Sequence, residues 1–190
     1  MFELLYKYYD KSSIITISIS IILFIYTVTL FWIFIYRYLL INRVISIESY
    51  SLKKLYLGRI STVDENSLLF PYVNRVLIPN RAIFSVAKGR AIKVASRGLT
   101  TLSIVSSTAP FIGLFGTVVS ILEALSNLSI ESGSGLSIIA PMISHSLVTT
   151  AGGIAVATFA YTFHLILKRR VYELGVLLDN QADLILAQKE

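Results

Sequence analysis

The chain has 190 residues, enough for one domain or one membrane unit. Apolar residues make up 55% of it and charged residues 15%, against roughly 25% charged residues in an average soluble protein. A soluble fold would need a more polar surface, so the net charge of +6 is better explained by cytoplasmic loops rich in Lys and Arg than by nucleic acid. Because there is no Cys, disulfides, Cys-based metal sites and thiol catalysis are excluded.

The first apolar run predicts a transmembrane helix over residues 12–36, after a short N-terminal segment of residues 1–11. It carries no charge, and about 25 residues at about 1.5 Å each cross a hydrocarbon core of roughly 30 Å. Acidic residues before the run, its length and the lack of a small-residue cleavage site argue against a signal peptide, so we expect the helix to be retained.

Residues 37–101 form a basic segment that we expect to be largely helical. Eleven basic and three acidic residues lie in it. Residues 37–56 are expected to continue the first helix. Turn formers between Gly58 and Pro79 should break that helix, and the basic run after Pro79 should form another helix that leads into the second span.

Two further apolar runs predict transmembrane helices over residues 102–125 and 136–167, joined by a short loop over residues 126–135. The third run exceeds one bilayer crossing, so part of it should tilt or project into water. After it, residues 168–190 predict an amphipathic helix. Its apolar face is predicted to carry Val171, Leu174, Leu178 and either Leu184 or Leu186.

The distribution of basic residues predicts the orientation. The segment 37–101 is basic, and Lys168 to Arg170 close the third span, whereas the loop 126–135 has Glu131 and no basic residue. By the positive-inside rule, the N-terminus and the short loop lie outside and the other two segments lie in the cytoplasm. The predicted fold is an all-α integral membrane protein with three transmembrane helices, the second and third extended into the cytoplasm.

The second and third spans are rich in small and polar residues, unlike the bulky first span. Small residues permit close helix packing in lipid and hydroxyls bond across helices, so these residues either pack helices or line a polar passage. Pro110 and Pro141 each remove a backbone donor inside a span. One explanation is that they only kink their helices. The other is that each leaves a free carbonyl group, which needs a hydrogen bond from water or from a hydroxyl such as that of Thr108.

His145 is the residue deep within a span whose side chain titrates near neutrality. An ionisable group in the membrane is a functional candidate, and the unperturbed imidazole pKa of about 6.5 suits proton exchange. The alternative is a neutral His bonded to a neighbouring helix. No Asp, Glu, Lys or Arg lies in the middle of any span, and no phosphate-binding, metal-binding or Ser-His-Asp pattern is present. We therefore expect no enzyme, no metal and no cofactor, and a second polypeptide that supplies the carboxylate if protons are conducted.

Two stretches then resemble a known family. Arg97 to Leu125 resembles the second transmembrane helix of the MotA/TolQ/ExbB proton-channel family, whose APxxGLxGTV core stands here at Ala109 to Val118. Ile139 to Tyr161 resembles the third helix of the ExbB and TolQ branch. The similarity runs from Arg97 to Arg170, and the residues before it agree with the family only in topology.

The resemblance implies a function. Family members form a pentameric ring in the bacterial inner membrane, with the N-terminus in the periplasm. The ring surrounds helices of an ExbD- or TolR-like single-span partner, whose Asp takes up and releases protons. Proton flow then energises a TonB- or TolA-like transducer for outer-membrane transport or envelope maintenance. On this interpretation the chain is a stator subunit of a motor driven by the proton-motive force. No nucleic-acid partner is expected, and the resemblance does not decide whether a phospholipid is bound.

The resemblance also assigns residues. Thr108 and Thr150 fall on the pore Thr positions of the second and third helices, and His145 falls where the family usually has Glu, a role that we do not transfer. The predicted proton-pathway residues are Ser107, Thr108, Thr117, His145, Thr149 and Thr150. The predicted kink and close-packing residues are Pro110, Gly113, Gly116, Pro141, Gly152 and Gly153. The alternatives are a membrane scaffold without ion flux and, more weakly supported, a standalone channel or transporter.

Overall fold

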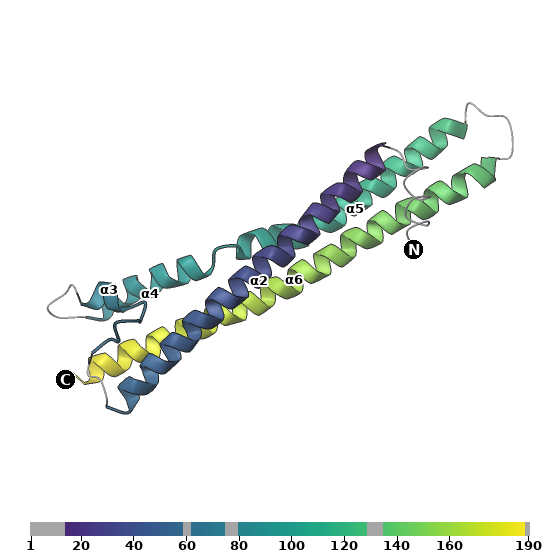
Figure 1. The fold of residues 1–190 in the computed structure, drawn as a ribbon. Helices are drawn as coiled ribbons and strands as arrows, with labels where there is room; N and C mark the ends of the chain where they lie inside the picture. The colour runs from purple at the N-terminus through teal and green to yellow at the C-terminus, as the bar shows by residue number, and fades with distance from the viewer. Residues whose placement is uncertain (1–13, 59–61, 75–79, 129–134, 189–190) are drawn as a thin grey trace. The chain divides into compact units, whose positions relative to one another are not determined.

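The structure, a computed structural model, describes residues 14–58, 62–74, 80–128 and 135–188. These residues form helices and connecting turns, with no strand among them, so the predicted all-α fold is confirmed. The helices are α2 (Ile14–Tyr56), α3 (Phe70–Val73), α4 (Arg81–Ala95), α5 (Leu99–Leu128) and α6 (Gly135–Ala187) (Figure 1).

Three of the described helices, α2, α5 and α6, are long and apolar enough to cross a membrane. The qualifying stretches are Ile17–Tyr56, Leu99–Ser126 and Ser146–Ala187. In α2, bulky side chains such as Phe24 and Trp32 remain 68% and 76% exposed, which suits a helix surface in contact with lipid tails. The prediction of three membrane-spanning helices is therefore confirmed.

The helices extend beyond the ranges expected for the spans. α2 continues through residue 36 without a break as far as Tyr56. α5 reaches Leu128 and α6 begins at Gly135, so residues 126–128 are helical although a loop was expected over residues 126–135. Residues 1–11 lie outside the described part of the chain.

The chain divides into two compact units, to which each of the long helices contributes. The span unit comprises Met1–Trp32 and Thr101–Phe163, and the basic unit comprises Ile33–Thr100 and His164–Glu190. Fifteen of the seventeen Lys and Arg residues belong to the basic unit. Among the described residues of the span unit, Glu123 is the single Asp, Glu, Lys or Arg. This separation of charge fits the high cost of placing an ion in hydrocarbon.

In the basic unit, α4 and the start of α5 are separate helices. Asn80 caps α4 by accepting a 3.0 Å hydrogen bond from the Ile83 N–H. Between the two helices lies Gly98, whose φ of 89° is a left-handed conformation that favours glycine. The sequence predicted the basic helix but missed this break before the second span.

The buried face of α6 in the basic unit includes a polar residue. The buried residues follow one another at intervals of three and four: Val171, Leu174, Leu178, Gln181 and Ile185. Sequence periodicity placed Leu184 or Leu186 at the end of this face. The structure buries Ile185 instead, because the three-four alternation continues through Gln181.

Gln181 is buried because it contacts the carboxylate of Glu48, which is 0% exposed. Glu48 accepts hydrogen bonds from Gln181 Nε2 at 2.8 Å, Ser67 Oγ at 2.8 Å and the Leu68 N–H at 2.7 Å. A buried carboxylate is tolerated only when such donors replace water. The cluster therefore connects α2, the segment before α3, and the end of α6.

An ion pair also holds the segment before α3. Lys54 Nζ lies 2.7 Å from Asp64 Oδ2, and the Asn66 N–H donates to Asp64 Oδ1 at 3.1 Å. The hydrogen bond from Lys54, followed by that from Asn66, holds the pKa of Asp64 below its usual range. The stability gained in this way is present above the unfolded-state pKa and is lost as pH falls through the folded-state pKa.

We expect Glu48→Ala to lower the free energy of unfolding by about 2 kcal/mol or more, because it removes the carboxylate that accepts from Ser67 and Gln181 and leaves the Leu68 N–H without its acceptor. The measurement is the midpoint of thermal unfolding of the detergent-solubilised protein. Glu65→Ala removes an equal charge from an exposed side chain and should change stability by less than about 0.5 kcal/mol. Equal midpoints for the two variants would contradict a stabilising role for the cluster.

Candidate functional site

Two glycines bring the backbones of α5 and α6 close together in the span unit. An ideal Cβ at Gly153 would lie 2.6 Å from the Ala109 carbonyl oxygen and 3.0 Å from Gly113 Cα. An ideal Cβ at Gly113 would in turn lie 3.1 Å from the Thr149 carbonyl oxygen and 3.1 Å from Thr150 Cα. A side chain at Gly153 would collide with the α5 backbone and one at Gly113 would be closer than an ordinary contact, so the two helices meet backbone to backbone, as small residues allow in lipid.

The other two predicted packing glycines differ from each other. An ideal Cβ at Gly116 would lie 3.0 Å from Thr149 Cγ2 and 3.3 Å from Ile19 Cδ1, so Gly116 permits close contact with both α6 and α2. At Gly152 the nearest atom would be Leu23 Cδ1 at 3.9 Å, an ordinary contact distance. The structure therefore places Gly113, Gly116 and Gly153, but not Gly152, at tight approaches.

Hydroxyl groups connect α5 to α6 next to this contact. Thr150 Oγ1 lies 3.0 Å from the Gly113 carbonyl oxygen, and Thr117 Oγ1 lies 3.2 Å from the Ser146 carbonyl oxygen. The hydroxyls of Thr117 and Thr150 also contact each other within hydrogen-bonding distance. Each hydroxyl has one proton to donate and can also accept, so this pair can form a continuous chain of bonds between the helices.

The structure does not place Thr108 and Ser107 in this pair. Thr108 Oγ1 donates to the Ile104 carbonyl at 2.8 Å, and Ser107 Oγ lies 3.0 Å from the Ser103 carbonyl, so both bond within α5. Ser107 is exposed and Thr108 is partly exposed. α5 remains helical through Pro110, which frees the carbonyl of residue 106, whereas the carbonyl that Thr108 contacts is that of Ile104.

The remaining predicted residues belong to α6. Thr149 is buried, with its methyl group beside Gly116. Positions 141 and 145 fall within the bounds of α6, but the side chains of Pro141 and His145 lie outside the described residues.

Ser146 also takes part in this contact, which its sequence position did not predict. Ser146 is 0% exposed; its hydroxyl donates to the Ile143 carbonyl at 2.8 Å and its own carbonyl accepts from Thr117. In the sequence it is one of many small residues. The spacing of small residues could have predicted the close-packing face of α6, because those on its buried face recur at a near-helical period: Ser146, Thr149, Gly153, Ala157 and Ala160.

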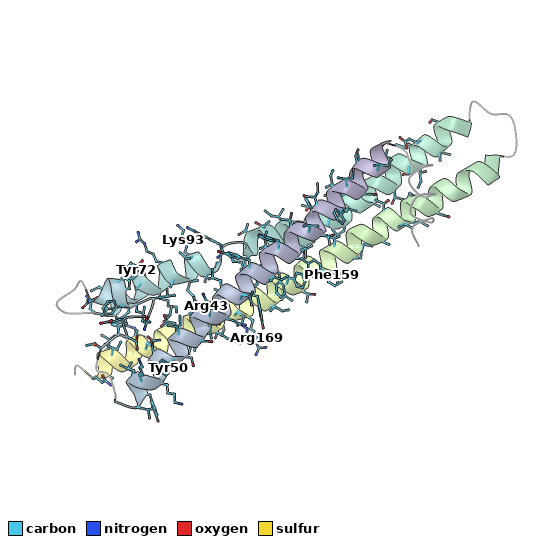
Figure 2. All side chains as sticks on the ribbon, in the orientation of Figure 1. Arg43, Tyr50, Tyr72, Lys93, Phe159 and Arg169 are labelled. Carbon is cyan, nitrogen blue, oxygen red and sulfur yellow. The ribbon has the colours of Figure 1, made fainter. Side chains whose placement is uncertain are left out.

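An aromatic cluster joins α2 to α6 in the same unit. Phe31 packs edge-on against Phe163, with ring centroids 5.2 Å apart, and its centroid lies 6.1 Å from that of Phe159 (Figure 2 labels Phe159). Aromatic pairs in this range of distance and tilt are favourable beyond the area they bury. The cluster holds α2 against α6, so α6 contacts both α2 and α5.

Residues 80–180 match the sequence profile of the MotA/TolQ/ExbB proton channel family. The chain belongs to this family. The matched range includes all of α5 and α6 that forms the glycine and threonine contacts, so the predicted resemblance is confirmed for the residues on which it was based.

Individual relatives carry ExbB names. ExbB-like biopolymer transport proteins from two strains of Helicobacter pylori are each 35% identical over 189 residues, which covers 100% of this chain and 100% of the relative. ExbB of Neisseria gonorrhoeae is 44% identical over 69 residues, 35% of this chain and 31% of the relative. ExbB of Pseudomonas putida is 34% identical over 76 residues, 40% and 23% of the two chains. Similarity to the Helicobacter proteins thus includes the N-terminal half, which the sequence matched to the family only in topology.

We expect Gly153→Ala to destabilise the α5–α6 contact by about 1–3 kcal/mol, because the new methyl group meets the Ala109 carbonyl and helix backbones cannot yield as a side chain can. Gly152→Ala is the matched control, since its methyl group meets only Leu23 at an ordinary distance. Thermal unfolding midpoints in detergent compare the two. Equal tolerance of both substitutions would contradict the close approach described at Gly153.

Proposed function

We propose that this chain is an ExbB/TolQ-like stator subunit of an inner-membrane motor driven by the proton-motive force. In this proposal five copies surround the helices of an ExbD- or TolR-like partner and energise a TonB- or TolA-like transducer for outer-membrane transport or envelope maintenance. The observation that carries the proposal is the similarity to ExbB-like biopolymer transport proteins over the full length of both chains.

The charges of the chain support a division of labour with a partner. The described part of the span unit has a single charged residue of the Asp, Glu, Lys and Arg types, Glu123, and it lies near the end of α5. A proton crossing the bilayer needs an ionisable carrier at intermediate depth. With no carboxylate of its own at that depth, the stator would depend on an acidic side chain of a second polypeptide.

The hydrogen bonds give the two pore threonines different tasks in this proposal. Thr150 is engaged with α5 through Gly113 and Thr117, so it holds the helix pair together whatever else it does. Thr108 donates only within its own helix, which leaves the lone pairs of its partly exposed hydroxyl able to accept from water or from a protonated carboxyl group. Thr108 is therefore the better residue for testing proton transfer.

One observation favours the second candidate, a membrane scaffold without ion flux. The Thr117–Thr150 pair and the glycine contacts have a complete explanation in helix packing alone. A scaffold would need these contacts but would have no use for the Thr108 hydroxyl.

We expect Thr108→Val to leave assembly intact and to abolish most of the proton flux. The measurement compares oligomer assembly by native mass spectrometry with proton uptake into liposomes that contain the chain together with its ExbD- or TolR-like partner. Thr27→Val is the matched control, because Thr27 makes the same kind of bond, to the Leu23 carbonyl at 2.9 Å, on α2. Full flux with Thr108→Val would favour the scaffold and overturn the stator proposal.

Thr150→Val should behave differently, because it removes cross-helix bonds. We expect a loss of stability of about 0.6 kcal/mol and at most about 1.7 kcal/mol, the average and the maximum measured for hydrogen bonds between membrane helices. Thermal unfolding in detergent checks this value, with Thr108→Val as the comparison that should remain close to the unmodified protein.

A further inference from the structure

Glu123 is an acidic side chain in an otherwise apolar part of the chain. On α2, α5 and α6 of the span unit, it is the single described residue of the Asp, Glu, Lys and Arg types, and the other titratable side chains described there are the phenols of Tyr26 and Tyr161. One of its carboxylate oxygens, Oε2, is buried. A carboxylate in such surroundings costs free energy, and ionisable groups in membrane segments commonly take part in function.

The position of Glu123 along α5 is close to one end of the membrane-spanning stretch. That stretch ends at Ser126, three residues further on, which is about 4.5 Å along the helix. By the positive-inside rule this end of α5 is the outer one. The side chain as a whole is half-buried, so it lies where external water and the interior of the span unit both have access to it.

Hydroxyl groups follow Glu123 along α5 toward the glycine contact. Ser120, three residues before Glu123, is 6% exposed, and Thr117 lies three residues before Ser120. Residues three apart are neighbours on a helix surface, so each step is about 4.5 Å along the axis. Thr117 in turn contacts Thr150 of α6. Because a hydroxyl both accepts and donates, this series can pass protons along α5.

We propose that Glu123 collects protons from the outer aqueous phase and delivers them into the span unit through Ser120 and Thr117. A carboxylate oxygen of Glu123 accepts a proton from hydronium or water outside. The proton then passes to the Ser120 hydroxyl, which releases its own proton to the next hydroxyl, and the carboxylate is restored. The final acceptor is the acidic side chain of the second polypeptide, so this inference rests on the proposed stator function and adds the group that loads the pathway from outside.

The test uses the full chain with its ExbD- or TolR-like partner in liposomes, selected for copies whose N-terminus faces the bulk solution. Proton uptake is measured over a range of outer pH. We expect Glu123→Gln, which keeps the shape of the side chain but cannot exchange a proton, to slow uptake by about tenfold or more at alkaline outer pH. The deficit should shrink at acidic outer pH, because hydronium is then abundant enough to enter without a collecting group.

Two further variants separate this role from a structural one. Glu123→Asp keeps a carboxylate and should restore most of the uptake and the pH profile of the unmodified chain. Glu65→Gln removes an equal charge from an exposed side chain of the basic unit and should change neither. A Glu123→Gln deficit of the same size at every outer pH would indicate a structural role and would overturn the proposal.

Thr108→Val distinguishes failure of this inference from failure of the stator proposal. If Thr108→Val abolishes uptake while Glu123→Gln leaves it unchanged, the stator proposal stands and the role of Glu123 is overturned. If the unmodified chain takes up no protons with its partner, both are overturned.

A second measurement depends neither on flux nor on a variant that folds. Dicyclohexylcarbodiimide reacts with protonated carboxyl groups in apolar surroundings. We expect it to modify Glu123 of the detergent-solubilised chain, faster as the pH falls, as measured by the mass of the peptide that contains Glu123. No modification of this peptide at any pH at which the chain stays folded would overturn the proposal.

Discussion

The contact of α5 with α6 depends on the absence of side chains at Gly113 and Gly153. Helices in lipid gain little from burying apolar groups against each other, so dispersion contacts and hydrogen bonds have to hold them together. With the backbones at this distance, the hydroxyls of Thr117 and Thr150 reach both each other and the carbonyls of the facing helix. A larger residue at Gly153 would push the helices apart and lengthen these bonds.

The basic unit is held together by a different set of polar contacts. Its buried polar groups include a carboxylate and an amide, and the Glu48 carboxylate accepts hydrogen bonds from Ser67, Leu68 and Gln181. Ion pairs such as Lys54–Asp64 add to this on its surface. Such groups can be desolvated only where several donors converge. The span unit avoids that requirement by using hydroxyls, which can bond to the backbone of their own helix.

The sequence predicted well whatever depends on composition and period. Three apolar runs identified the membrane helices, and the APxxGLxGTV core was sufficient to identify the family. The sequence could not show which threonines contact each other. That depends on the register between α5 and α6, which depends on which glycines face each other, and all four glycines look equivalent in the sequence. The burial of Glu48 and Gln181 was missed because it depends on partners distant in the chain, although Gln181 at an apolar position was a signal. The break at Gly98 is local, since it depends on the positive φ that glycine allows.

The glycine contact also has a consequence for how rigid each copy is. Backbone atoms in contact have no rotamers to change, so the spacing between α5 and α6 has almost no freedom to adapt. The outward side chains of α5, such as Phe111, Phe115 and Leu122, are more than half exposed and keep their torsional freedom. A stiff helix pair with a compliant exterior can fit unlike neighbours by reorienting side chains alone, and in the proposed ring this would let identical copies enclose a partner that lacks their symmetry.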